Sequence, residues 1–415
     1  MMINNNPLLP IHRFFMGLYL CGSMGLFAVW FVPQGANTLQ SGSTAIFMSC
    51  WAFFYAYSIL VIANYKFNLT KLEWLILAFP IYFIVSTSWS LLPAKTLIYS
   101  ISFLLNMLAI IALKRLYDFD ELINLIVNLL FAMVVFSLVF SFLGVEQVKY
   151  IDPHNRPTIL GTEPIRGMFN HKITAGLYAA LGFNLSLLLT EGRKKYIYIV
   201  VFFLFTLLTG SATGLSILVI GLSLIGLNKL CLSLQVSKVK YLTCLLTFFG
   251  LVLYVSMVFG EDILLFLGRD PTLTGRTLLW SWGLDTSFDK PILGWGYLGY
   301  NGTLIAGSVA ETYVEFTNYD APHFHNSYIQ MLVDGGYIFT CVLVISYFYA
   351  LSNWYELSLK NISQSAQAYC FIILLLLIGG VFIHLLCRYN DFPTMMLMIS
   401  LVFIPDVDSG QHEIT

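Results

Sequence analysis

Two histidines and an asparagine stand where a polar segment meets an apolar one. They belong to the run Ala321-Pro322-His323-Phe324-His325-Asn326-Ser327-Tyr328, and mostly apolar residues follow it. Imidazole is the side chain best suited to accept or donate a proton near neutral pH. These polar groups therefore lie at a boundary where acid–base chemistry on a membrane-bound substrate could take place.

The other histidines are distributed unevenly. Of the seven histidines, His154, His171, His323 and His325 lie in or at the ends of two long polar segments. His384 lies near the outward end of the predicted eleventh span, four residues before Arg388. The topology derived below places all five on one side of the membrane. Histidines also occur at membrane interfaces for ordinary reasons, and that is the alternative for each of them except His325.

Cationic residues gather in the same segments. They are Arg156, Arg166, Lys172, Arg269, Arg276 and Arg388. A guanidinium group matches phosphate oxygens bidentately, so this set is suited to a phosphorylated substrate. The alternative is a set of interfacial charges paired with nearby aspartates. That alternative is preferred for Arg156, Arg269 and Arg388, whereas Arg166 and Arg276 lie inside motifs and are expected to function.

Several other chemistries lack their motifs. The sequence contains no H-E-x-x-H, Gly-x-Ser-x-Gly or P-loop pattern, and none of its seven cysteines forms a C-x-x-C pair. His323 and His325 alone are too few ligands for a catalytic zinc ion. We expect no metal, no other cofactor and no nucleic-acid partner.

The elements that position these residues are predicted to be membrane helices. Hydrophobic residues make up 58% of the chain and charged residues 10%, and the mean hydropathy is +0.79. About twelve apolar runs are long enough, or nearly so, to cross the bilayer as helices. The runs are 14–33, 44–64, 72–92, 95–114, 121–143, 170–190, 196–209, 212–228, 241–260, 325–350, 366–386 and 390–404.

Charge asymmetry orients these spans. An even number of spans puts both termini on one side, and with that side cytoplasmic the inward loops hold twelve of the 21 lysines and arginines. The short outward loops hold only Lys95 and Arg388, as the positive-inside rule requires. We therefore predict one transmembrane domain, 1–404, with a cytoplasmic tail, 405–415. Its long outward segments are 144–169 and 261–324, the latter between spans nine and ten.

The larger outward segment is predicted to contain a short amphipathic helix at the interface. Leu278, Leu279, Trp282 and Phe288 fall on one helical face, and Pro291 lies past its end. The glycine- and aromatic-rich residues 294–300 that follow are typical of a packed loop.

Three motifs resemble the O-antigen ligase family, which includes O-antigen and exopolysaccharide polymerases. The first motif is Arg166-Gly167-Met168-Phe169-Asn170-His171-Lys172. The second is Gly275-Arg276-Thr277-Leu278-Leu279-Trp280, with Pro291-Ile292-Leu293-Gly294-Trp295-Gly296 behind it. The third is His325-Asn326-Ser327-Tyr328, followed by Gly335-Gly336. The resemblance covers roughly 160–345.

The resemblance implies an integral membrane glycosyltransferase with a GT-C-like helical fold in the bacterial inner membrane, working at the periplasmic face without metal. Its donor is a glycan on undecaprenyl diphosphate. The acceptor is the lipid A–core in a ligase, our first expectation, or another lipid-linked glycan in a polymerase. Arg276 would hold the diphosphate, and His325 would act at the acceptor hydroxyl. Substrate contacts are also expected at the residues Arg166, Lys172, His171, Asn326 and His323.

One position departs from the ligase pattern. Ligases often carry a Ser-Arg-Gly-like turn where this chain has Ser211-Ala212-Thr213-Gly214. Arg166 or Lys172 is expected to replace the arginine missing at Ala212. A lipid-linked-sugar flippase or other transporter is the more remote alternative, because transporters commonly carry ionisable residues near the midplane and these span interiors are almost free of them.

Overall fold

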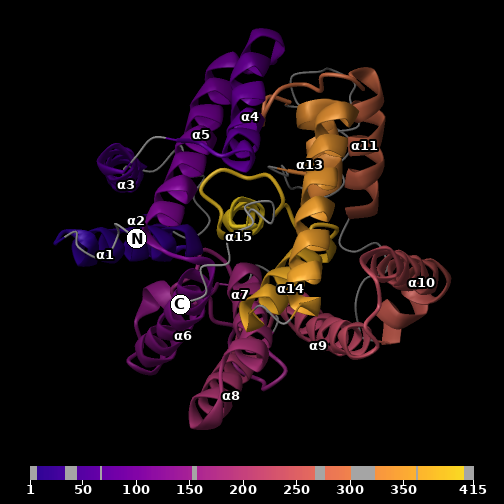
Figure 1. The fold of residues 1–415 in the computed structure, drawn as a ribbon. Coiled ribbons are helices and arrows are strands. Elements are labelled where there is room, and N and C mark those ends of the chain that lie inside the picture. The colour runs from indigo at the N-terminus through magenta and orange to yellow at the C-terminus, as the bar shows by residue number, and fades with distance from the viewer. Residues whose placement is uncertain are drawn as a thin grey trace.

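The computed structural model describes residues 7–32, 44–65, 68–151, 157–266, 276–300, 323–360 and 363–405. Over these residues the protein is an all-α polytopic membrane protein (Figure 1). Pairing of extended backbone in this part of the chain is limited to an isolated antiparallel bridge between Lys149 and Ile165. The predicted all-α class is confirmed.

The helices follow the apolar runs closely. They are α1 Leu9–Met24, α2 Leu26–Phe31, α3 Thr44–Asn64, α4 Lys71–Val85, α5 Pro93–Leu116, α6 Phe119–Phe142, α7 Lys172–Leu189, α8 Gly192–Leu208, α9 Ala212–Ser233, α10 Lys238–Phe266, α11 Arg276–Asp289, α13 Ser327–Leu359, α14 Gln364–Gly379 and α15 Phe392–Val402. Two short 3₁₀ helices, η1 Ser86–Trp89 and η2 Glu146–Val148, follow α4 and α6.

Seven helices in the described residues are long and apolar enough to cross a membrane. They are Ala45–Asn64, Lys71–Trp89, Pro93–Leu116, Phe119–Phe142, Lys172–Leu189, Ala212–Ser233 and Ser327–Leu359. Helices α14 and α15 are apolar but shorter. Each of the twelve predicted runs coincides with a helix or with the helix pair α1–α2, and the count of about twelve spans remains a prediction.

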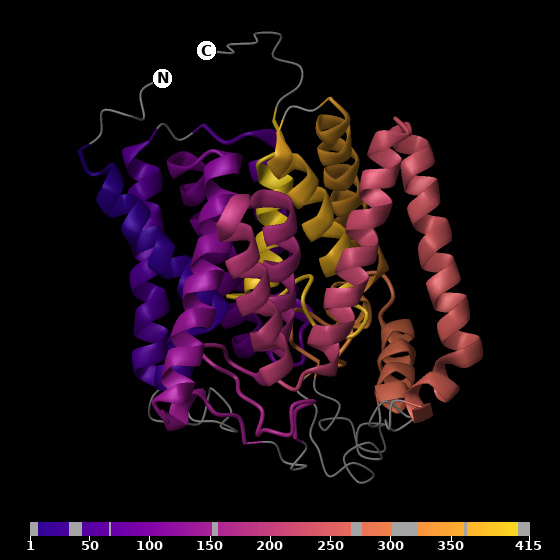
Figure 2. The same ribbon diagram turned by 90° about the horizontal axis from the view of Figure 1, so that it is seen from below.

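Different segments of the chain lie at the two ends of the helix bundle. In Figure 2 the beginning of α1 and the end of α15 lie at the same end of the bundle. The segment that joins α6 to α7 lies at the opposite end. This arrangement agrees with an even number of spans, and we refer to the two ends as the terminal end and the opposite end.

The predicted eleventh span, 366–386, is wrong over its last third, 380–386. Helix α14 ends at Gly379, and α15 does not begin until Phe392. The residues between them, 380–391, form a non-helical loop whose backbone groups bond to the hydroxyl groups of Ser327 and Thr394. Non-helical backbone is tolerated inside a membrane protein where such partners satisfy it.

Helix α13 is continuous in sequence pattern but broken in structure. Gly336, inside the predicted span 325–350, has a φ of +75°. A Cβ atom at this position would lie 2.3 Å from the carbonyl oxygen of Ile292, so only glycine fits. The next residue, Tyr337, donates its N–H to the carbonyl of Pro291 at 2.7 Å instead of bonding within the helix.

The packed loop predicted at 294–300 fills this break. Trp295 and Gly296 donate their backbone N–H groups to the carbonyls of Val333 and Asp334, at 2.7 and 3.0 Å. These are carbonyls that a broken helix leaves without partners. The loop after α11 and the glycine pair of the third motif therefore form one interlocked unit.

Helix α11 packs along the first part of α13, as Figure 1 shows. The predicted amphipathic helix is present, and Leu279 and Trp282 are buried against Phe324 and the start of α13. Phe288 was assigned to the same face wrongly, since its side chain is 67% exposed. It lies six residues beyond Trp282, which places it well away from the buried face of a helix with 3.6 residues per turn.

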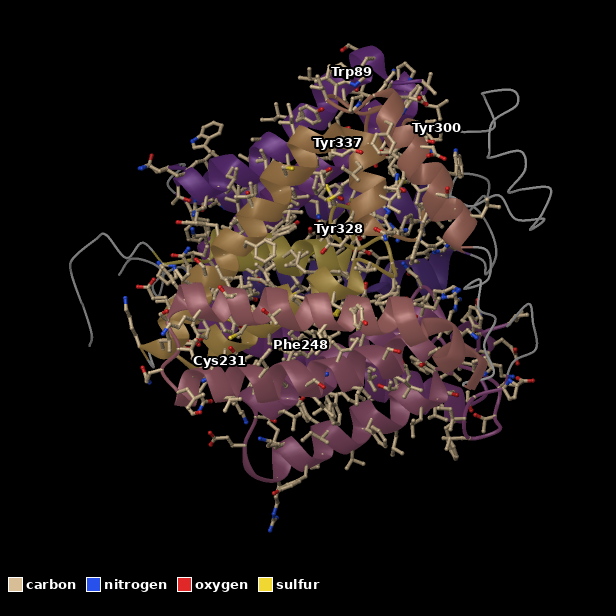
Figure 3. The ribbon with its side chains drawn as sticks, turned by 90° about the vertical axis from the view of Figure 1, so that its right-hand side faces the viewer. Trp89, Cys231, Phe248, Tyr300, Tyr328 and Tyr337 are labelled. Atoms are coloured by element: carbon tan, nitrogen blue, oxygen red, sulfur yellow. The ribbon has the colours of Figure 1, made fainter. Side chains whose placement is uncertain are left out.

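The hydroxyl groups of two tyrosines contact side chains of α11. Figure 3 shows Tyr300 and Tyr337 beside this helix. The hydroxyl of Tyr300 accepts the indole N–H of Trp282 at 3.2 Å, and the hydroxyl of Tyr337 lies 3.3 Å from that of Ser287. These contacts hold α11 against the loop that follows it and against the second part of α13.

Candidate active site

The turn before α13 begins with a helix cap. The side-chain oxygen of Asn326 accepts the backbone N–H groups of Tyr328 and Ile329, at 2.9 and 3.1 Å. Asparagine is among the best residues at this position because it satisfies N–H groups that the first helical turn leaves unpaired. The oxygen of Asn326 is thus engaged in fixing where α13 starts.

Ser327 joins the same turn to the loop 380–391. Its hydroxyl donates to the carbonyl of Ile383 at 2.7 Å and accepts the N–H groups of Leu385 and Leu386, at 2.7 and 3.2 Å. Its own N–H donates to the carbonyl of Gly380 at 2.7 Å. A single small side chain thereby clamps the loop on both sides of residue 384.

His325 is the member of the third motif that is held in an unfavourable backbone conformation. Its φ is +52°, in the left-handed region that residues other than glycine seldom adopt. Its N–H donates to Nδ1 of His323 at 3.2 Å, and the two rings lie 4.3 Å apart. Backbone strain of this kind concentrates at functional sites, where the surrounding structure imposes it.

Helix α11 brings Arg276 close to this turn. The indole N–H of Trp280 donates to the carbonyl of Phe324 at 3.1 Å. Arg276 is the first residue of α11, about one helical turn before Trp280. The helix that carries the second motif therefore contacts the residue directly before the third motif.

Arg166 lies at the centre of the loop between α6 and α7. Its side chain is buried, with Nε donating to the carbonyl of Gln147 at 2.9 Å and Nη1 to that of Asn170 at 3.4 Å. Its backbone N–H donates to the carbonyl of Val148 at 3.0 Å. Two guanidinium nitrogens therefore hold the loop in shape, which is a structural function that the sequence did not indicate.

His171 and Lys172 lie beside Tyr150 at the start of α7. Nδ1 of His171 accepts the N–H of Ile173 at 3.1 Å and so caps the helix, while Nε2 lies 2.7 Å from the hydroxyl of Tyr150. The ammonium group of Lys172 lies 5.2 Å from the centroid of the Tyr150 ring. These residues form a second polar group, separate in the hydrogen-bond pattern from the histidine turn.

Ala212 lies near this second group. Ser211 caps α9 by accepting the N–H of Gly214 at 3.1 Å. A Cβ atom added to Gly214 would lie 2.8 Å from the backbone of Gly176, which belongs to the second turn of α7. The position of the missing arginine and the helix that begins with Lys172 are therefore neighbours.

The loop 380–391 contains polar residues that the sequence did not assign to the site. His384 is only 2% exposed, and its ring lies 5.5 Å from that of His323. Its Nε2 atom is buried without a hydrogen-bond partner. Burial, reinforced by the guanidinium of Arg388, lowers the pKa of His384 to about 3, so this imidazole is neutral at pH 7.

The loop and the start of α15 contact two other parts of the bundle. The hydroxyl of Tyr297, in the loop after α11, accepts the N–H of Tyr389 at 2.9 Å. The ring centroid of Phe392, the first residue of α15, lies 5.2 Å from that of Tyr178 of α7. The glycine pair Gly379-Gly380 and the polar stretch from Arg388 to Asp391 were the sequence signals that could have revealed this loop.

A family model of known proteins matches part of the chain. Residues 197–345 match the family model described as O-antigen ligase. This match supports the resemblance of the chain to the O-antigen ligase family. The matched residues include Arg276 and the whole histidine turn, whereas the Arg166–Lys172 motif precedes them.

A curated relative extends the match along the chain. The exopolysaccharide production protein ExoQ of Rhizobium meliloti (strain 1021) is 28% identical over 311 residues, which make up 70% of this chain and 68% of that protein. The chain is thus a multi-pass membrane protein that is similar to O-antigen ligases and to a protein of exopolysaccharide production.

Proposed function

We propose that this protein transfers a glycan from undecaprenyl diphosphate to a sugar hydroxyl at the periplasmic face of the inner membrane. The observation that supports the proposal is the set of hydrogen bonds made by the three residues that follow His325. Asn326 caps α13, Ser327 clamps the loop 380–391, and Tyr328 donates to the carbonyl of Leu377 at 2.8 Å. Three consecutive residues of the motif thus fix the backbone on which the strained His325 stands.

The proposed reaction needs few groups. The acceptor oxygen forms a new bond to the anomeric carbon of the donor, and the bond from that carbon to the diphosphate breaks. His325 would take the hydroxyl proton, and a positioned base of this kind contributes about 10² to 10⁴ in rate. Undecaprenyl diphosphate leaves as an anion, so cations beside it would stabilise the developing charge. No step requires a metal ion.

We assign the donor's diphosphate to Arg276 first, because α11 holds this residue about one helical turn from the indole that bonds the histidine turn. Lys172 is assigned the second cationic contact. It is preferred to Arg166, since the guanidinium of Arg166 already donates to two carbonyls. His323, Asn326 and His171 are assigned to sugar and phosphate oxygens around these cations.

The acceptor is proposed to be a second lipid-linked glycan. The similarity to an exopolysaccharide production protein and the absence of the ligase arginine at Ala212 both favour this polymerase activity. Transfer to lipid A–core, the ligase activity, is the second candidate. The transporter alternative is disfavoured, because the family match includes both Arg276 and His325.

Gene deletion separates the two acceptors. If the protein is a polymerase, deletion leaves lipid-linked single repeats and abolishes long polymer. If it is a ligase, lipid-linked polymer accumulates while the lipid A–core stays unmodified. Reconstituted wild-type protein that moves the donor across vesicles and never forms a new glycosidic bond would overturn both.

A further inference from the structure

The loop 380–391 places a third imidazole behind the two histidines of the motif. His384 is nine-tenths buried or more, its ring lies 5.5 Å from that of His323, and its Nε2 atom has no hydrogen-bond partner. A buried ring nitrogen without a partner costs free energy and calls for an explanation. Its neighbour His323 in turn binds the backbone of His325.

Hydrogen-bond partners indicate which ring nitrogens of His323 and His384 can accept a proton. Nδ1 of His323 accepts the N–H of His325, so neutral His323 carries its proton on Nε2. Nε2 of His384 is buried without a hydrogen-bond partner, and in the tautomer that carries the proton on Nδ1 this atom presents a lone pair.

We propose that His384 is a positioning residue of the same active centre, whose Nε2 accepts the Nε2 proton of His323 when substrate closes the site. This contact would hold His323 in the tautomer that binds the backbone of His325 and so would keep His325 in its left-handed conformation. The proposal rests on the proposed function, because it assigns His325 to the acceptor hydroxyl.

The clamp by Ser327 supports this assignment. Its hydroxyl bonds to Ile383 on one side of His384 and to Leu385 and Leu386 on the other. The position of the His384 backbone is therefore set by the motif residue two places after His325. A loop that was only a connection between α14 and α15 would not need this link to the motif.

Replacement of one ring nitrogen at a time tests the role. His384→Phe keeps the volume of the ring and removes both nitrogens. His384→Gln places an amide near the position of Nε2, and His384→Asn places one near that of Nδ1. We expect kcat to fall about 10- to 100-fold in the Phe variant with the donor KM within twofold of wild type. The Gln variant should recover most of this loss, and the Asn variant little.

A matched control separates positioning from folding. His12, near the start of α1 at the terminal end, is also buried and also has an Nε2 atom without a partner. His12→Phe should leave kcat unchanged, and all variants should remain monodisperse in detergent with melting temperatures near wild type. Wild-type kcat in His384→Phe, or equal losses in the Phe, Gln and Asn variants with lowered melting temperatures, would overturn the positioning role.

Failure of the proposed function would look different. In that case wild-type protein would form no glycosidic product from the lipid-diphosphate donor, and His325→Ala would match it. An active wild type and an inactive His325→Ala, combined with a fully active His384→Phe, would leave the proposed function standing and reject the inference about His384.

Discussion

Two buried polar clusters show opposite degrees of hydrogen bonding. One surrounds Glu73 at the start of α4, near the terminal end, and the other surrounds His384 in the loop 380–391. Glu73 is fully buried, and both of its carboxylate oxygens have partners. In the second cluster, Nε2 of His384 and Oδ2 of Asp391 are buried without partners.

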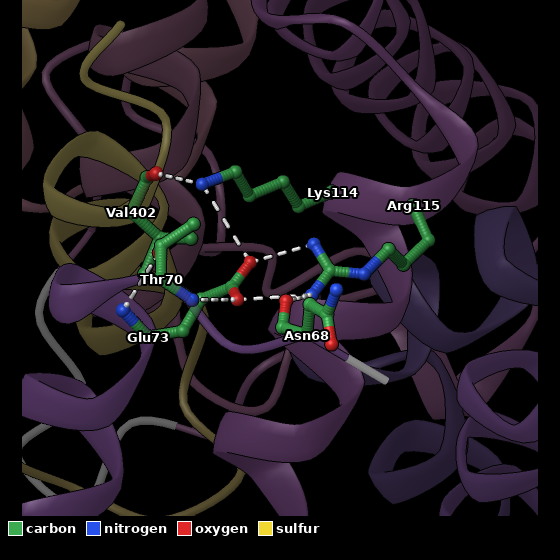
Figure 4. Close-up of polar contacts among 6 residues, drawn as sticks. All are labelled: Asn68, Thr70, Glu73, Lys114, Arg115 and Val402. Carbon is green, nitrogen blue, oxygen red and sulfur yellow. Dashed lines mark hydrogen bonds and ion pairs between the residues drawn. The ribbon is translucent and has the colours of Figure 1, made fainter. Parts of the chain in front are cut away.

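Figure 4 shows how completely the first cluster is paired. The guanidinium of Arg115 binds both oxygens of Glu73, at 2.7 and 2.9 Å, and the ammonium of Lys114 lies 3.6 Å from one of them. The N–H of Thr70 donates to the same carboxylate at 2.9 Å, and Lys114 also donates to the carbonyl of Val402 at 2.7 Å. This cluster ties α4, α5 and the end of α15 together.

The difference teaches which cluster maintains the fold and which is available for chemistry. A buried ion pair with every polar atom satisfied has no bonding capacity left for a substrate. A buried group with an unsatisfied atom retains that capacity and lowers stability until a partner arrives. The comparison predicts that substitutions in the second cluster change activity and that substitutions in the first change stability.

The largest effect is expected at His325. His325→Ala removes the proposed base and should lower transfer about 10²-fold or more. The hydrogen bonds of Asn326, Ser327 and Tyr328 that hold the turn remain, so the melting temperature should change little. Turnover by purified variant and wild type, assayed with lipid-linked donor, measures the difference. Wild-type turnover in His325→Ala would remove this residue from the mechanism.

Glu73 should show the reverse behaviour. Glu73→Ala leaves the guanidinium of Arg115 without its carboxylate, and breaking such a buried pair costs about 3 kcal/mol or more. The melting temperature should fall while kcat at low temperature stays near wild type. Glu121→Ala, which breaks the more exposed pair with Arg13, is the matched control and should cost about 1 kcal/mol or less. A loss of kcat without a loss of stability in Glu73→Ala would break the comparison.

Arg276 should show a graded loss. A lysine retains the charge and loses the fork that binds two phosphate oxygens, so Arg276→Lys should lose about tenfold in turnover and Arg276→Ala more. Donor titration of both variants in detergent or nanodiscs tests this order. Equal activity in wild type, Lys and Ala variants would make Arg276 a structural residue.

A smaller effect is expected where the ligase arginine is missing. Lys172→Ala should weaken donor affinity a few-fold, and adding Ala212→Arg should restore part of it, because α7 and α9 begin side by side. Arg166→Ala should affect yield and stability more than affinity, since its guanidinium holds the loop. Donor affinity that falls in Arg166→Ala and not in Lys172→Ala would reverse this assignment.

Chelation should have the smallest effect. The proposed reaction uses a donor with its own leaving group and cationic side chains to receive it, so transfer should persist in EDTA. Restoration of a lost activity by a divalent cation, in purified protein free of outer-membrane lipid, would contradict the metal-free mechanism.

Most of the fold could be predicted from the apolar runs of the sequence, but less of the site could. The apolar runs located every span-length helix, and the three motifs indicated the family because their residue types and order are specific. The loop 380–391 was missed because residues 381–387 are largely apolar, so hydropathy extended α14 through them. After α14 ends, Ser327 binds the backbone of the loop. One of these partners, the carbonyl of Ile383, lies 56 residues later in the sequence.

The role of Arg166 was hidden for a related reason. A cation beside a motif resembles a phosphate ligand in sequence, and only the fold reveals that two carbonyls occupy its nitrogens. The break at Gly336 was visible as a glycine pair, but its cause is a backbone from a different segment, the loop that follows α11. Long-range backbone contacts of this kind leave no local pattern.

The clamp formed by Ser327 has a consequence for the synthesis of the protein. Its hydroxyl binds backbone groups that follow it by 56 to 59 residues, beyond the end of α14. The turn that carries His325 therefore cannot be completed while the ribosome is still making α13 and α14. A nascent chain inserted only that far would hold every proposed catalytic residue and still lack the contacts that fix them. Transferase activity should thus begin only after the loop 380–391 has been synthesised and inserted.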